Sequence, residues 1–243
     1  MVVIEKIEID IIILSYAYTE ELKQTTMDCI NSLIASEDPG HIKFNVVVLE
    51  SKKELAAYQY PHSKTIYPEQ LFGYHRYMNM GIQLTSSSYL CLCNNDLIFH
   101  QHWASEILKE MEKTPDLLSA SPVCSIVHPT LGVVLNSGVR LGYRVGFEIA
   151  GWCLFMKREI FRKIGKLDEN YRFSGADHDY ANTLGFLNIK HALITSSIVD
   201  HANSKTLKTQ TQQRQDELTL NVFYHAKKWT YRILPARDTN HQL

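Results

Sequence analysis

Carboxylate and imidazole side chains that could bind a cation or move a proton occur at three points of the chain. Asp96 follows an apolar stretch, Asp177 and Asp179 flank a histidine, and His201 ends a second apolar stretch. Hard divalent cations prefer oxygen ligands and are often held by few protein ligands together with substrate phosphates. These residue types suit cation-assisted chemistry, and they also suit simple capping of turns and helices.

The spacing of the two neighbouring aspartates separates their expected roles. Residues two positions apart on a helix do not share a face, so Asp177 and Asp179 are expected to have different roles. One is expected to act as a general base, while the other caps the helix or forms an ion pair.

Apolar stretches before these polar residues predict the strands that position them. Asp10–Ser15 and Phe44–Leu49 are continuous apolar runs, typical of strands buried on both faces, and Tyr89–Cys93 is a third. Open α/β sheets bind ligands beyond the carboxyl ends of their strands. The side chains delivered to those ends are Ser15, Tyr16, Glu50, Asn94, Asn95 and Asp96.

Helical patterns alternate with these strands, which predicts an α/β fold with a central, mostly parallel mixed sheet flanked by helices. Thr19 is expected to cap a helix that begins at Glu20, and other helices are expected over 69–84, 103–111, 158–164 and 217–229. Further strands are expected over 151–157 and 192–199, and 204–215 is expected to be a mobile loop. We expect a single domain over 1–243, with a nucleotide-binding half (1–100), an acceptor and catalytic half (101–203) and a C-terminal loop and helix (204–243).

Composition narrows the class of protein. The 243 residues carry a formal net charge of −1, which gives no general attraction to nucleic acid or anionic lipid. The apolar runs are too short to span a bilayer and the N-terminus does not resemble a signal peptide.

The five cysteines show no disulfide spacing, and the pair Cys91 and Cys93 favours core packing over metal ligation. A soluble, cytoplasmic protein is expected.

Two common nucleotide-binding motifs are missing from the sequence. No G-x-G-x-x-G follows the first predicted strand and no G-x-x-x-x-G-K-[ST] occurs in the chain. The sequence therefore disfavours dinucleotide-dependent dehydrogenases and P-loop phosphotransferases.

An ordered series of short motifs favours a different class. The series comprises Asp10-Ile-Ile-Ile-Leu-Ser-Tyr16, Asn79-Met80-Gly81, Asn94-Asn95-Asp96, Gly151–Arg158, Ile164–Glu169, Gly175–Tyr180 and Lys228-Trp229. In order and context these stretches resemble glycosyltransferase family 2 proteins of the GT-A fold, which have a single Rossmann-like domain.

The resemblance implies a role for each matching residue. Asp177 aligns with the carboxylate that deprotonates the acceptor hydroxyl. Asp96 and His201 would hold a divalent cation, Mn²⁺ or Mg²⁺, at the diphosphate. Trp152 and Asp179 would belong to the acceptor or sugar pocket. The remaining residues at the nucleotide-sugar would be Ser15, Tyr16, Glu50, Asn79, Asn94 and Asn95.

The implied activity is that of a metal-dependent inverting glycosyltransferase in glycan biosynthesis. It would move one sugar from a nucleotide-diphosphate sugar donor to a glycan or other hydroxyl-bearing acceptor. Transfer of a single sugar is favoured because the chain lacks the transmembrane helices of processive synthases.

Two departures from the family pattern keep other interpretations open. Asn94 replaces the first aspartate of the D-x-D motif, and Ala176 replaces the acid before the expected base, so the base is Asp177 or Asp179. One alternative is a catalytically inactive module that binds a sugar-nucleotide or a glycan. Another is a sugar nucleotidyltransferase, although Ser15–Thr19 lacks the glycine-rich, basic loop which that class needs.

Overall fold

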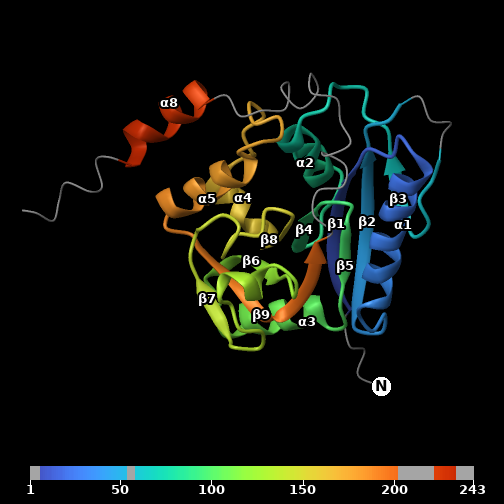
Figure 1. The fold of residues 1–243 in the computed structure, drawn as a ribbon, viewed down its shortest axis with the longest axis horizontal. Helices are drawn as coiled ribbons and strands as arrows, with labels where there is room; N and C mark the ends of the chain where they lie inside the picture. The colour runs from blue at the N-terminus through green and yellow to red at the C-terminus, as the bar shows by residue number, and fades with distance from the viewer. Residues whose placement is uncertain (1–5, 54–57, 202–221, 234–243) are drawn as a thin grey trace, which may run out of the picture.

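The computed structural model describes residues 6–53, 58–201 and 222–233 (Figure 1). Within these ranges nine strands form one sheet in the order β3-β2-β1-β4-β8-β6-β9-β5, and β7 also pairs with β9. The strands are β1 (Ile7–Ser15), β2 (Ile42–Glu50), β3 (Ser63–Ile66), β4 (Tyr89–Cys93), β5 (Leu97–Phe99), β6 (Leu117–Val123), β7 (Val139–Leu141), β8 (Cys153–Lys157) and β9 (Lys190–His201). The helices are α1 (Glu20–Ala35), α2 (Tyr74–Gln83), α3 (Trp103–Lys113), α4 (Phe161–Ile164), α5 (Ala176–Phe186) and α8 (Val222–Ile233), with the short 3-10 helices η1 (His128–Leu131) and η2 (Arg158–Ile160).

The sheet has a buried core on each face. Alternate residues of β1 point to opposite faces, so Ile11 and Ile13 pack with α1 and α3. Ile12 and Leu14 pack on the other face with α2 and α5. Burial on both faces explains the unbroken apolar run of this strand, and Figure 1 shows helices on both sides of the sheet.

Strand direction brings the candidate residues to one edge of the sheet. Strands β3, β2, β1 and β4 are parallel, whereas β8 runs antiparallel to β4. The start of β8 therefore lies beside the carboxyl end of β4. Strand β6 is antiparallel to β8 and parallel to β9, so β9 also ends at this edge, where Leu97 of β5 pairs with His201.

Most predicted elements of the first half are confirmed. Strand β4 has the predicted bounds, and the Thr19 side chain accepts a hydrogen bond from the Leu22 N–H at 3.2 Å, as expected of a helix cap. The predicted helix start at residue 69 is wrong, because Gly73 has an extended backbone and α2 begins at Tyr74.

The close approach of α2 to β1 depends on Gly81. A Cβ atom at this position would lie 2.4 Å from the Ile12 Cγ2 atom, well inside van der Waals contact. The glycine of the asparagine-glycine motif thus serves helix–sheet packing.

Two short strands of the first half, β3 and β5, were not predicted, because four-residue and three-residue strands have no clear periodicity. The expected loop at 204–215 lies outside the described residues. The predicted last helix overlaps α8, which continues beyond the predicted end at 229 to Ile233.

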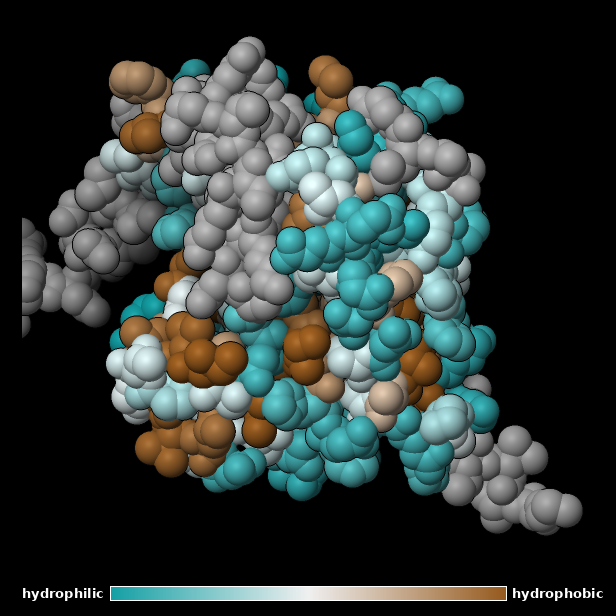
Figure 2. Space-filling view, turned by 45° about the vertical axis from the view of Figure 1, so that its right-hand side comes forward, coloured by the Kyte–Doolittle hydropathy of each residue, from teal (hydrophilic) through white to brown (hydrophobic). Residues whose placement is uncertain are grey.

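The surface is mixed in hydropathy. Figure 2 shows apolar groups scattered among hydrophilic ones on one face. Exposed apolar side chains between β6 and β8 include Ile126, Val134 and Leu141. Across the described part of the chain, no helix combines the length and the apolar character needed to cross a bilayer.

Candidate active site at the carboxyl edge of the sheet

Asp96 and His201 form the centre of the candidate site. The pairing of β5 with β9 places them together, and His201 Nε2 lies 3.3 Å from Asp96 Oδ1. Both side chains are nearly buried, at 4% exposure for Asp96 and 12% for His201. Among the described residues, the buried Nε2 atom finds no hydrogen-bond partner of acceptable geometry.

An unpartnered buried imidazole nitrogen beside a carboxylate is costly unless a ligand satisfies it. One nitrogen and one oxygen donor facing each other match the ligands that Mn²⁺ and related cations accept. The residues present therefore fit the divalent cation that the sequence implies.

Trp152 covers this pair. Its ring stacks on that of His201, with centroids 5.5 Å apart and an angle of 15° between the planes. Its carbonyl oxygen accepts a hydrogen bond from the Asn94 N–H at 2.9 Å, which ties the start of β8 to the loop that carries Asp96. Stacking on an indole restricts the rotation of the His201 ring and so orients its nitrogen.

Thr26 of α1 joins Ser15, the last residue of β1, to Asn95, which follows β4. The Thr26 hydroxyl accepts a hydrogen bond from the Asn95 amide at 2.8 Å and lies 3.0 Å from the Ser15 hydroxyl. Ser15 and Asn95 are buried, whereas Tyr16 is half-buried and packs near Tyr18, with ring centroids 5.3 Å apart. Tyr16 is thus partly exposed, unlike Ser15 and Asn95.

Glu50, expected near the base or ribose, lies within the protein with 1% exposure. Its carboxylate accepts hydrogen bonds from the backbone N–H groups of Ala17 (3.1 Å) and Lys52 (2.8 Å). The Tyr60 hydroxyl donates a third at 3.1 Å. In this arrangement Glu50 holds together the chain segments that leave β1 and β2.

Asn79 also uses its amide inside the protein. It donates to the Leu167 carbonyl oxygen at 2.8 Å and accepts from the Leu167 N–H at 3.0 Å. A further hydrogen bond reaches the Glu169 carboxylate at 3.1 Å. Asn79 thereby fixes the segment after α4 to α2.

Asp177 lies in the first turn of α5, next to the segment that carries Trp152. A Cβ atom added to Gly151 would lie 2.7 Å from Asp177 Cβ and 3.1 Å from Asp177 Oδ2. Asp177 Oδ1 accepts a hydrogen bond from the His178 N–H at 2.8 Å, and the side chain is 35% exposed. A partly exposed carboxylate at this position can accept a proton from a ligand.

Asp179 points in a different direction, toward α8. Its Oδ1 atom lies 2.7 Å from the ammonium of Lys228 and accepts a hydrogen bond from the Trp229 indole at 2.9 Å. Lys228 also pairs with Asp168 at 2.7 Å. Burial raises the pKa of Asp168, but hydrogen bonds from Lys228 and Tyr224 outweigh burial and hold that pKa well below its ordinary value.

The contacts of α8 separate the two aspartates of the Asp177-His178-Asp179 cluster. Asp177 remains partly exposed, whereas Asp179, expected in the acceptor pocket, is only 3% exposed and anchors a helix. Sequence reasoning missed Thr26 and Tyr60, which organise the strand ends. Tyr60 lies in an irregular stretch before a proline, where no periodic signal exists.

Comparison with known proteins identifies the family. The Glycosyl transferase family 2 profile matches residues 10–165, well over half of the chain. The chain belongs to glycosyltransferase family 2. A search of curated proteins returned no match.

Two solved structures share the fold of this family 2 chain at low sequence identity. One is GalNAc-T7 with UDP, GalNAc and Mn²⁺, with a TM-score of 0.63 and 11% identity over 80% of this chain. The chain spans only 43% of the length of that protein. The other is a mutant of the Drosophila β1,4-galactosyltransferase 7 in complex with manganese, UDP-Gal and xylobiose. Its TM-score is 0.52 and its identity 13%, covering 97% of this chain and 82% of the other.

Both neighbours are glycosyltransferases of the GT-A fold, so the GT-A fold class expected from the sequence is confirmed. The family 2 match ends at residue 165, whereas Asp177, His201 and α8 lie beyond it. The candidate site therefore consists of residues inside the family match together with residues beyond it, and the structure shows both groups.

Proposed function

We propose that this chain is a metal-dependent, inverting glycosyltransferase. It transfers one sugar from a nucleotide-diphosphate sugar to a hydroxyl group of a glycan or other acceptor. The observation that carries the proposal is the Asp96–His201 pair, whose buried Nε2 atom lacks a hydrogen-bond partner among the described residues. The two structural neighbours, crystallised with Mn²⁺ and UDP or a UDP-sugar, support it.

Asp96 and His201 would hold the cation, with Trp152 fixing the imidazole. A bound divalent cation neutralises the negative charge that grows on a diphosphate leaving group. Because Asn94 stands where relatives carry another aspartate, the chain offers only one carboxylate here, and we expect weak binding of the cation without nucleotide.

Asp177 is the proposed general base. Its partly exposed carboxylate would take the proton of the acceptor hydroxyl as that oxygen attacks the anomeric carbon. Attack from the face opposite the leaving diphosphate inverts the anomeric centre. Trp152 would form one wall of the sugar pocket, since aromatic faces pack against sugar C–H groups.

The donor side is proposed at the ends of β1 and β4. Tyr16, half-buried next to Tyr18, is placed to stack on a base, and Ser15, Asn94 and Asn95 shape the loops around the phosphates. The contacts of Glu50 and Asn79 support an indirect role for both, in which they hold the loops that line the pocket.

Thermal unfolding with nucleoside diphosphates tests the proposal. A ligand that binds only the folded state raises the midpoint according to its affinity. We expect one of UDP, GDP or dTDP to raise the midpoint with Mn²⁺ and much less without it, and Asp96→Ala to remove the Mn²⁺-dependent part. No shift with any diphosphate would refute a nucleotide-sugar transferase. Binding without turnover of the matching sugar donor would instead show an inactive binding module.

A further inference from the structure

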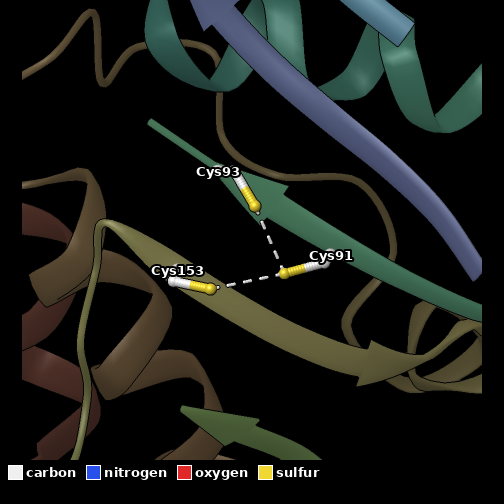
Figure 3. Close-up of side chains that lie close together, drawn as sticks. All are labelled: Cys91, Cys93 and Cys153. Carbon is white, nitrogen blue, oxygen red and sulfur yellow. Dashed lines mark hydrogen bonds between the residues drawn. The ribbon is translucent and has the colours of Figure 1, made fainter. Parts of the chain in front are cut away.

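Three cysteine thiols converge in the core beneath the candidate site. Cys91 and Cys93 come from β4 and Cys153 from β8, and Figure 3 shows the three sulfurs pointing toward one another. The sulfur of Cys91 lies 3.4 Å from that of Cys93 and 3.5 Å from that of Cys153. All three sulfurs lie within 4.8 Å of one another.

Strand register brings the thiols together. Residues two apart on a strand share a face, which places Cys91 beside Cys93. Cys93 lies directly opposite Cys153 in the antiparallel pair, so the third thiol joins the same face. Two cysteines at this spacing are typical of core packing, but three sulfurs that converge from two strands can bind one metal ion together.

We propose that Cys91, Cys93 and Cys153 form a binding site for a thiophilic divalent cation such as Zn²⁺. Zinc–sulfur bonds are about 2.3 Å, so three sulfurs around one ion stand roughly 4 Å apart. The observed separations need only small side-chain rotations to reach that spacing. Thiolates select soft or borderline ions, whereas Mg²⁺ and Mn²⁺ prefer oxygen, so this site is chemically distinct from Asp96 and His201.

The surroundings of the cluster are apolar and include Phe155 and Trp103. A cation binds the thiolate form of cysteine, so three S–H bonds break as three metal–sulfur bonds form, and three protons leave for solvent. The two positive charges of the cation offset two of the three thiolate charges, which limits the cost of burying them.

A cation in this position would join β4 to β8 directly below the candidate active site. Cys93 precedes the Asn94-Asn95-Asp96 loop, and Cys153 follows Trp152. The three thiols are fully buried, so we expect the cation to enter during folding and to stabilise the folded state. This inference does not depend on the proposed transferase activity.

The test is to refold the reduced full-length chain with Cd²⁺ as a spectroscopic probe and with Zn²⁺. We expect a thiolate-to-cadmium charge-transfer band that saturates at one equivalent, and a higher unfolding midpoint with either ion. Cys153→Ser should weaken Cd²⁺ binding by more than about 100-fold. Loss of a side chain that only supports a metal ligand can already weaken binding by about 100-fold, and Cys153 is itself a proposed ligand. Cys124→Ser is the matched control, because Cys124 is equally buried but lies outside the cluster, and it should keep the band.

The absence of a band in the wild type, or an equal band in Cys153→Ser, would overturn the proposal. If two free thiols disappear when the chain is refolded without metal, two of the cysteines have formed a disulfide. This outcome would also overturn the proposal. If Cys153→Ser does not fold, X-ray absorption of the zinc-loaded wild type decides, and fewer than three sulfur ligands refutes the site. The Mn²⁺-dependent nucleotide shift of the wild type and of Cys124→Ser reports separately on the proposed function.

Discussion

Asp177 and Asp179 show how two identical side chains acquire different surroundings. The first turn of α5 presents Asp177 to the segment at Gly151, while Asp179 faces α8. The helical period accounts for this division, as the sequence predicted.

Asp177→Asn should therefore lower sugar transfer by about 10²–10⁴-fold, the usual contribution of a general base. Nucleotide binding in the presence of Mn²⁺ should be unchanged, because Asp177 is not among the proposed cation ligands. Single-turnover kinetics and the thermal shift with nucleotide measure the two effects. An equal loss of both would show that Asp177 supports the structure or the cation instead.

Asp179→Asn is the comparison for that experiment. It weakens the contact with Lys228 and leaves the Asp177 carboxylate in place. We expect lower stability and much less effect on the chemical step than with Asp177→Asn. The reverse ranking of the two variants would assign the base to Asp179.

Gly151 is predicted to control the position of the base. In Gly151→Ala the new Cβ atom would meet Asp177 Cβ at 2.7 Å, so the carboxylate must move. We expect kcat to fall by at least about 10-fold with a smaller change in KM for the donor, since misplacement of a reacting group affects mainly the chemical step.

Gly185→Ala serves as the control, because Gly185 lies on α5, the helix that carries Asp177. Its added Cβ atom meets its nearest neighbour, in Tyr143, at 3.7 Å, an ordinary contact, and alanine favours the helix. This variant should keep its activity. If Gly151→Ala also keeps it, Asp177 does not need its observed position for the reaction.

At the scale of elements, α8 is held to the domain through buried charge. The ammonium of Lys228 lies 2.7 Å from both Asp168 and Asp179, and its side chain is 17% exposed. Removing this cation leaves two carboxylates close together and largely out of water, which is costly.

Lys228→Met should thus lower the free energy of unfolding by roughly 2 kcal/mol at neutral pH. The depressed pKa of Asp168 sets the sign of the pH dependence. Its ionised form stabilises the protein above its unfolded-state pKa, and this stabilisation is lost as pH falls through the lower folded-state pKa. The difference between wild type and variant should therefore shrink in acid. Denaturant titration measures it, with the exposed neighbour Lys227→Met as a control that should change little.

At the scale of the whole molecule, neutral histidines in the interior set the response to mild acid. His191 Nε2 donates to the Glu148 carbonyl oxygen at 2.9 Å, so Nδ1 accepts from the Ser119 hydroxyl at 2.7 Å. Burial lowers the pKa of His191 to about 4, and burial also lowers those of His75 and His128.

Stability should consequently fall as pH drops from about 6.5 toward 4, because the unfolded chain binds protons that the folded chain excludes. Each such histidine contributes up to about 1.4 kcal/mol per pH unit. His191→Asn should reduce the slope of unfolding free energy against pH in this window, as measured by urea titration. An unchanged slope would show that His191 is protonated in the folded state.

The sequence by itself determined the alternation of strands and helices, the parallel first half and the family. Continuous apolar runs, the Thr19 cap and the motif order are local signals, because they depend on the period of a strand or helix and on neighbouring residues. They also indicated that polar residues gather at strand ends, since parallel strands carry their carboxyl ends to one edge.

Only the tertiary structure decided which of these polar side chains form contacts inside the protein and which stay partly exposed. Glu50 and Asn79 have the side-chain types of binding residues, yet partners far away in the sequence use their polar atoms. The third cysteine joins Cys91 and Cys93 only through the register between β4 and β8. Such pairings follow from how distant segments pack, and no local period of the sequence encodes them.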